Sequence, residues 1–209
     1  GGRRVRLLGL ALAAVAGLLI ILLALSNGIH QNLVRAATTI ASGHVNVAGF
    51  YKTSSGAMGI PVVNGRDELK QFLSTANPHI TEIIDRHRGW AKIISDDASV
   101  WTGLYGIDIA QERGLKAQLR SPSSESPAEK GLAGLSAPNT IALFQSQAEK
   151  LKVGPGDKVT LRTETMRGVS NTVDLTVVTI LENMGIISSW NAFLPQKTVI
   201  ELYRLRSDS

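Results

Sequence analysis

Residues able to ligate a metal or to act as acid and base are few and scattered in this sequence. The histidines are His30, His44, His79 and His87, and only the last two, with Glu82 between them, are close enough in sequence to be considered together. Their spacing does not match His-Glu-x-x-His, which places two ligands and a base on one helix face. Two helical turns separate His79 from His87, too far for one shared ion. Surface histidines are the better interpretation, and no metal is predicted.

A glycine-rich segment at residues 153–158 is the nearest match to a phosphate-binding loop. Such a loop presents backbone N–H groups and leads into a helix through Lys-Ser or Lys-Thr. Here Pro155 removes one donor, and a strand pattern follows Lys158. We therefore predict a β-turn, with Gly156 supplying the turn conformation and Asp157 bonding the turn backbone.

Composition excludes several function classes. The 209 residues include no cysteine, which excludes disulfides, thiolate metal sites and a cysteine nucleophile. No Gly-x-Ser-x-Gly motif or nucleophile–base pair is present. The formal net charge is +5, much of it from the amino-terminal arginines, and aromatic residues are only 5%. Since no basic stripe is seen, the sequence indicates neither an enzyme nor a nucleic-acid-binding protein, and it predicts no cofactor.

An uncharged apolar run at residues 7–25 is the element around which the chain is organised. At about 1.5 Å per residue, its 19 residues reach roughly the thickness of a bilayer's hydrocarbon core. In lipid such a run can span only as a helix. Three arginines precede it and no charge follows until Arg35, which predicts a cytoplasmic amino end and an external remainder. Among the predicted membrane-spanning positions are Leu7, Leu12, Leu18, Ile21 and Leu25.

Two other interpretations of this run compete with a membrane anchor. A signal peptide has the same order of charge and apolar core, and Ala24-Leu25-Ser26 resembles a cleavage site. Its apolar core is usually about 7–15 residues, however, which is shorter than this run. A helix of a soluble domain is rarely apolar all round for this length. We therefore expect an uncleaved anchor.

A periodic apolar stripe follows the membrane run. It predicts that the helix continues outward as a stalk that packs on something and stops at Gly43, whereas a solvated linker is the alternative. The stripe consists of Ile29, Leu33, Ala37 and Ile40.

The remaining pattern predicts an α+β domain rather than an alternating βαβ one. A polar loop at residues 121–127 is the best internal boundary. Predicted strands lie at residues 44–47, 90–95, 100–107, 158–165 and 172–181, and predicted helices at 66–75, 80–87, 138–151 and 195–205.

Three stretches carry motifs of a known family. The first is the apolar run with its continuation to Ser42-Gly43-His44-Val45, and the second is the segment ending Gly106-Ile107-Asp108. The third leads from a helix into a hairpin and contains Ala148, Leu151, Val153, Gly156, Asp157 and Val159. Together they resemble the MacB/FtsX superfamily of ABC transporter permeases, most closely the lipoprotein-releasing LolC/LolE type.

The resemblance implies one N-terminal transmembrane helix extended as a stalk into a two-lobed mixed α/β extracytoplasmic domain. Residues 1–43 would form the helix and stalk, 44–113 with 196–209 an α/β lobe, and 114–195 a β-rich second lobe. The match covers only the front half of the family's protein, and the chain begins Gly-Gly rather than Met. We therefore expect it to be part of a longer protein.

By the same resemblance, the chain would be a non-enzymatic permease subunit in a bacterial inner membrane with its domain in the periplasm. Its expected partners are a cytoplasmic ABC ATPase, a second permease copy or paralogue, the lipid bilayer, and a lipoprotein or other periplasmic cargo. One alternative is an FtsX-like mechanotransmitter that regulates a cell-wall hydrolase, although its outer domain is typically smaller. Another is a single-span anchored binding domain.

Overall fold

A computed structural model describes residues 2–38, 43–47, 63, 65–122, 128–165, 168–184, 188 and 190–205. The chain divides into two compact units, Gly1–Val47 and Ala48–Ser209, and each is described by itself.

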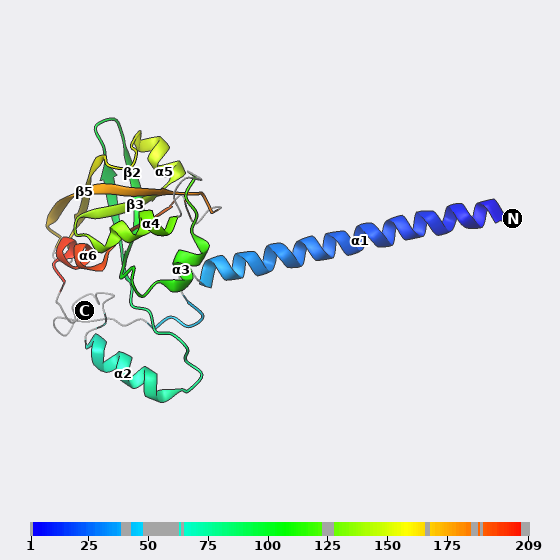
Figure 1. The fold of residues 1–209 in the computed structure, drawn as a ribbon, viewed down its shortest axis with the longest axis horizontal. Helices are drawn as coiled ribbons and strands as arrows, with labels where there is room; N and C mark the ends of the chain where they lie inside the picture. Colours follow the sequence, from blue (N-terminus) through cyan, green and yellow to red (C-terminus); the bar gives the residue numbers. More distant parts are fainter. Residues whose placement is uncertain are drawn as a thin grey trace. The chain divides into compact units, whose positions relative to one another are not determined.

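The first unit is dominated by helix α1 (Gly2–Ala36), drawn in Figure 1 as one uninterrupted helix. By length and composition, Gly2–Val34 is long and apolar enough to cross a membrane, with a mean hydropathy of 2.9 and none of its most apolar window buried. The apolar run at residues 7–25 lies wholly inside α1. The predicted membrane-spanning side chains are exposed, as lipid-facing residues would be: Leu7, Leu12, Leu18, Ile21 and Leu25.

The predicted stalk is partly described. Helix α1 runs past the apolar segment, and Ala37 and Thr38 continue it in a π-helical turn. Ile29 and Leu33 are exposed in the single chain, so their packing role stays a prediction, and Ile40 lies outside the described residues. Gly43 has φ +68°, and its N–H donates to Thr38 O at 2.7 Å.

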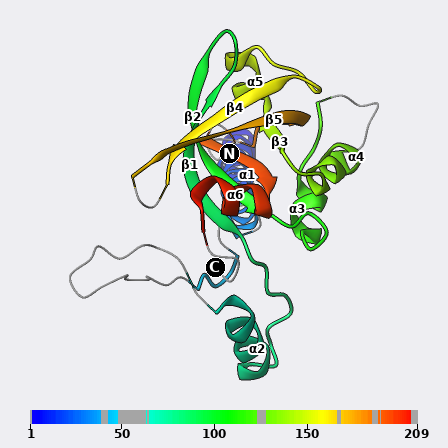
Figure 2. The same ribbon diagram turned by 90° about the vertical axis from the view of Figure 1, so that its left-hand side faces the viewer.

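The second unit is built on a six-stranded closed barrel with the strand order β1-β2-β6-β3-β5-β4 (Figures 1 and 2). Strands β2 and β6 pair in parallel, as do β3 and β5, and the other pairs are antiparallel. The strands are β1 (His87–Ile94), β2 (Ser99–Ile107), β3 (Thr140–Phe144), β4 (Lys158–Glu164), β5 (Ser170–Leu181) and β6 (Asn191–Pro195). The chain is therefore α+β.

Alternate residues of each strand fill the barrel. Helix α6 (Gln196–Tyr203) closes the core by contributing Val199, Leu202 and Tyr203. The strand residues of this core include Ala91, Ile93, Leu104, Ile141, Leu143, Leu161, Val177, Ala192 and Leu194. Period-two alternation explains why residues on either side of these face outward.

Part of the outer barrel face is covered by short helices. Helix α4 (Ala128–Ala133) packs on β5, and the 3₁₀ helix η2 (Gly134–Ser136) contacts β3, β5 and β6. Figure 2 shows α3 (Arg113–Gln118) beside α4 on this flank. Beneath these helices the rings of Phe144 and Phe193 lie 5.9 Å apart, centroid to centroid. The barrel thus has a second, external apolar cluster, which buries both faces of β3.

Burial on both faces explains one wrong prediction. Residues 138–151 were predicted to be one helix, but they form β3 followed by α5 (Gln145–Leu151). All five residues of β3 are buried, with Ile141 facing the barrel core and Phe144 facing the external cluster. A short apolar run of this kind cannot be told from a helix by periodicity alone.

Two other predicted elements are wrong. Residues 80–86 have no regular structure where a helix was expected, and His87 begins β1 instead. Ile80 and Ile84 are exposed, so their spacing does not mark a buried helix face. Residues 44–47, predicted as a strand, form a bend followed by exposed residues without regular structure, and they have no partner strand in the described part of the chain.

Other elements confirm the predictions, including the strands at 90–95 and 100–107 and the hairpin of β4 and β5. The helices at 66–75 and 195–205 are found as α2 (Arg66–Ala76) and α6. Two lobes are not shown, because β1 and β2 of the first predicted lobe pair with β4 and β6 of the second within one barrel. The residue boundaries of the two lobes stay a prediction.

Candidate functional site

The family-motif residues in the barrel lie at packing and turn positions. A Cβ added to Gly106 would come within 2.6 Å of Val199 Cγ2, so this glycine lets α6 approach β2. Asp108 follows β2, and its Oδ1 accepts from Ala110 N at 3.1 Å while Oδ2 accepts from Gln111 Nε2 at 2.7 Å. Both residues therefore shape the backbone and present no free reactive group.

The segment at residues 153–158 is a turn. Gly156 has φ +97°, a left-handed region that favours glycine. Asp157 Oδ2 accepts from Gly154 N at 2.7 Å, and Gly156 N donates to Val177 O at 2.7 Å. These backbone N–H groups of the loop are thus hydrogen-bonded to other protein atoms rather than directed at a phosphate.

The histidines do not form a site. His44 and His79 are exposed, as is Glu82. His87 is buried, with its Nδ1 3.0 Å from Gln196 Nε2. Within the described ranges, no group of three or more histidine, cysteine or carboxylate residues could hold a metal ion.

Three exposed tryptophans are the feature that sequence reasoning missed. Trp90 and Trp101 are each 60% exposed and Trp190 is 53% exposed, and they are all of the tryptophans in the chain. Trp90 lies on β1, Trp101 on β2, and Trp190 immediately precedes β6. Both strands that carry Trp90 and Trp101 were predicted from the sequence, at residues 90–95 and 100–107. The signal available in the sequence was that an aromatic residue stands on each strand; the register that brings the two together is not encoded locally.

Strand register brings two of these tryptophans onto one outer surface. Trp90 lies opposite Gly103, and Trp101 lies opposite Lys92. Lys92 in turn lies opposite Arg162 of β4, so that one row across three strands reads Trp101, Lys92, Arg162. We call the outward residues Arg88, Trp90, Lys92, Trp101 and Arg162 the tryptophan face.

Hydrogen bonds fix the backbone of Trp90 in place. Its N–H donates to Tyr203 Oη at 2.7 Å, while its carbonyl accepts from Tyr203 Oη at 2.7 Å and from Thr163 Oγ1 at 2.7 Å. A Cβ at Gly89 would overlap the Tyr203 ring, so only glycine admits this contact. Helix α6 thus fixes the backbone that presents Trp90 to solvent.

A cation also lies on an aromatic ring at one end of this face. Arg88 is opposite Tyr105, and its guanidinium carbon is 5.4 Å from the ring centroid. This distance is within the range of a cation–π contact. The side chains at this end are therefore mutually oriented.

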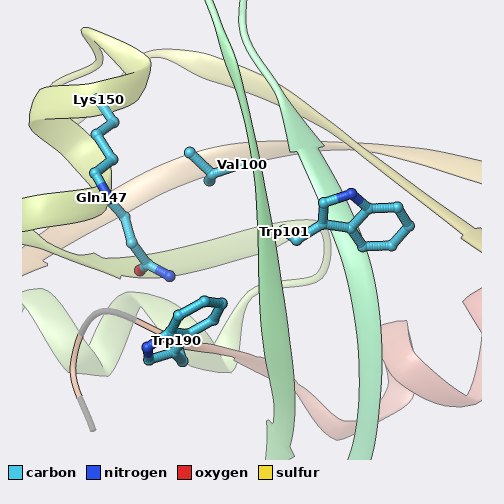
Figure 3. Close-up of a pocket in the computed structure, with 5 residues that line it drawn as sticks. All are labelled: Val100, Trp101, Gln147, Lys150 and Trp190. Carbon is cyan, nitrogen blue, oxygen red and sulfur yellow. The ribbon is translucent and has the colours of Figure 1, made fainter. Parts of the chain in front are cut away.

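A pocket of about 400 Å³ opens beside the tryptophan face (Figure 3). Gln147 at its wall is buried, and both ends of its amide are hydrogen-bonded. Nε2 donates to Thr102 Oγ1 at 2.8 Å, and Oε1 accepts from Phe144 N at 3.2 Å. Figure 3 shows Trp190 near Gln147 and the Trp101 ring on the opposite side of the strands from Val100. The lining residues are Val100, Trp101, Gln147, Lys150 and Trp190. The pocket thus presents aromatic surface and one amine.

Comparison with known proteins finds similar solved structures, two of which are described here, whereas no family model and no curated protein matches the chain. One is the extracellular domain of the noncanonic ABC-type transporter YknZ from Gram-positive bacteria, with 14% identity, a TM-score of 0.44, and coverage of 68% of this chain and 67% of that one. The other is a domain of a protein assigned as a permease from Porphyromonas gingivalis, with 16% identity, a TM-score of 0.38, and coverage of 74% and 64%. In both comparisons, about a third of the other chain lies outside the match.

Proposed function

We propose that this chain is the membrane-anchored, extracytoplasmic part of an ABC transporter permease of the MacB/FtsX superfamily. The observation that carries the proposal is α1, a single 35-residue helix that contains the apolar run at residues 7–25. Its arginines at positions 3, 4 and 6 favour a cytoplasmic amino end. The barrel unit then lies on the outer side.

The length of α1 suits a mechanical role. Thirty-five residues span about 50 Å, against roughly 30 Å for a hydrocarbon core. The residues of α1 that follow Leu25 therefore extend about 15 Å beyond the lipid as the same helix. A continuous helix transmits displacement that a flexible linker would dissipate, and a separate cytoplasmic ATPase would supply that displacement.

The finer assignment is to the LolC/LolE type, with lipoprotein release as the activity and a second permease copy or paralogue as the partner. It is supported by the sequence motifs around Gly43, Gly106 and Gly156. In this assignment the barrel handles cargo, and ATP is hydrolysed elsewhere.

Purification from the native membrane tests the proposal. The natural protein would be tagged, extracted in mild detergent and analysed by mass spectrometry beside an untagged strain. An ABC ATPase recovered in stoichiometric amount is the expected result. Recovery of the ATPase together with a cell-wall hydrolase would favour the FtsX-like alternative. Recovery without any ATPase would overturn the permease assignment in favour of an anchored domain.

A further inference from the structure

We propose that the tryptophan face binds the headgroup surface of an anionic phospholipid bilayer. This proposal requires only one part of the proposed function, namely that α1 anchors the chain in a membrane. It adds a second contact with lipid, made by the barrel unit itself.

The first argument is the type and exposure of the aromatic side chains. Trp90 and Trp101 are more than half exposed on a sheet whose other face is the barrel core. An indole ring has an apolar body and a polar N–H, and it favours the boundary between lipid and water. Trp90 and Trp101 occupy neighbouring outward positions on adjacent strands, so both rings lie on the same side of the sheet.

The second argument is charge. All 17 acidic residues and 18 of the 22 basic residues lie in residues 48–209, so this unit is nearly balanced. The outward positions of β1, β2 and β4 are not balanced, since Glu164 is their single acidic residue. Their basic residues are Arg88, Lys92, Lys158 and Arg162. A surface of this sign attracts anionic headgroups, and the attraction weakens as salt is added.

The third argument is a pairing that is unfavourable in the isolated fold. Lys92 and Arg162 lie directly opposite each other on neighbouring strands. Like charges that lie directly opposite each other on neighbouring strands destabilise the folded state. Arg162 Nε lies 3.3 Å from Ser170 Oγ, and neither cation forms an ion pair with another described residue. An external phosphate between the two cations would relieve the repulsion.

A bilayer fits these observations better than an acidic protein does. Tryptophan and arginine are also common at protein interfaces. However, the outward side chains of β1 and β2 include no carboxylate to set the register of a protein partner. A lipid surface needs no register, and a chain inserted through α1 meets it at high effective concentration.

The intrinsic fluorescence of the whole chain provides the test. All three tryptophans belong to the barrel unit and α1 has none, so tryptophan quenching by lipid reports on the barrel alone. The full chain would be reconstituted into vesicles of phosphatidylcholine, or of phosphatidylcholine with phosphatidylglycerol, each brominated near the headgroup. We expect quenching in the anionic vesicles that is lost at high salt, and little quenching in the neutral ones.

The decisive variant is Lys92→Glu with Arg162→Glu. Its matched control, Arg113→Glu with Lys197→Glu, makes the same charge change at exposed positions on α3 and α6. We expect the first to lose quenching and the second to keep it, with unchanged circular dichroism for both. Equal behaviour of the two variants would overturn the proposal, as would absence of quenching in a chain that floats with the vesicles. Failure to float would overturn the membrane anchor as well, so the two proposals fail in different ways.

Discussion

At the scale of single residues, the barrel depends on polar contacts made far apart in sequence. Tyr203 is the clearest case, because its hydroxyl both accepts from and donates to the backbone of Trp90. Thr163 satisfies the same carbonyl, so loss of the tyrosine hydroxyl would chiefly leave the Trp90 N–H without a partner.

Replacement of that hydroxyl therefore has a predictable cost. We expect Tyr203→Phe to lower the free energy of unfolding by about 1–3 kcal/mol, the usual penalty for an unsatisfied buried donor. The measurement is urea unfolding of the full chain in detergent, followed by tryptophan fluorescence. Tyr105→Phe is the matched control, because the structure records no hydrogen bond of that hydroxyl with the described residues. Equal losses in the two variants would contradict the role given to Tyr203.

A buried ion pair ties the segment before β1 to the start of α3. Arg86 Nε lies 2.6 Å from Glu112 Oε1 and Arg86 Nη2 donates to Oε2 at 2.7 Å, with side-chain exposures of 10% and 0%. We expect Glu112→Ala to destabilise the barrel by about 3–5 kcal/mol, because the guanidinium loses its buried counter-charge. The same urea titration measures this loss of unfolding free energy. Asp67→Ala, which removes a carboxylate with 89% exposure, should cost little.

At the scale of elements, the local sequence pattern identified several of the strands and helices. Strands β1, β2, β4 and β5 and helix α2 lie where the local sequence pattern predicted strands and a helix. Strand β6 was missed because four of its five residues are buried and show no alternation. The same cause misassigned β3. The parallel pairing of β2 with β6 joins segments far apart in the chain, and no short-range signal encodes it.

The candidate site was harder to predict than the strands. Each tryptophan was visible in the sequence, but their common face depends on the register that places Trp101 opposite Lys92 and Lys92 opposite Arg162. The second of these pairings joins β1 to β4, with β2 and β3 between them in sequence. Periodicity gives the side of a strand on which a residue lies, and not its neighbour on another strand.

The docking of α6 onto β2 offers a test at this scale. A Cβ at Gly106 would meet Val199 Cγ2 at 2.6 Å, so Gly106→Ala should cost about 1–3 kcal/mol by overpacking. Val199→Ala should itself destabilise by opening a cavity. In a double-mutant cycle, we expect the combined loss of unfolding free energy to be smaller than the sum of the two, because the shortened side chain makes room for the new methyl group. Additive losses would show that the two residues do not share this contact.

At the scale of the whole molecule, the absence of cysteine makes topology directly measurable. We expect Ser99→Cys, at an exposed barrel position, to react in intact cells with a maleimide that cannot cross the inner membrane. Gly2→Cys should react only after that membrane is permeabilised, because the arginines that follow it favour the cytoplasm. The reverse pattern of labelling would contradict the proposed orientation.

The proposed role of α1 as a stalk leads to a prediction about coupling. Gln31 and Asn32 lie in α1 beyond the apolar run, and their replacement by a Gly-Gly pair weakens the helix by about 1 kcal/mol per residue relative to alanine. If the proposed function is right, the complex should still assemble with an ATPase and hydrolyse ATP, while transport falls because the helix now bends where it must push. An Ala-Ala pair at the same positions removes the same side chains and keeps the helix stiff, so transport should be retained. ATPase rate and cargo release would be measured side by side in the reconstituted complex. Equal transport in the two variants would show that stiffness of α1 does not carry the signal, and parallel loss of hydrolysis and transport would point to failed assembly instead.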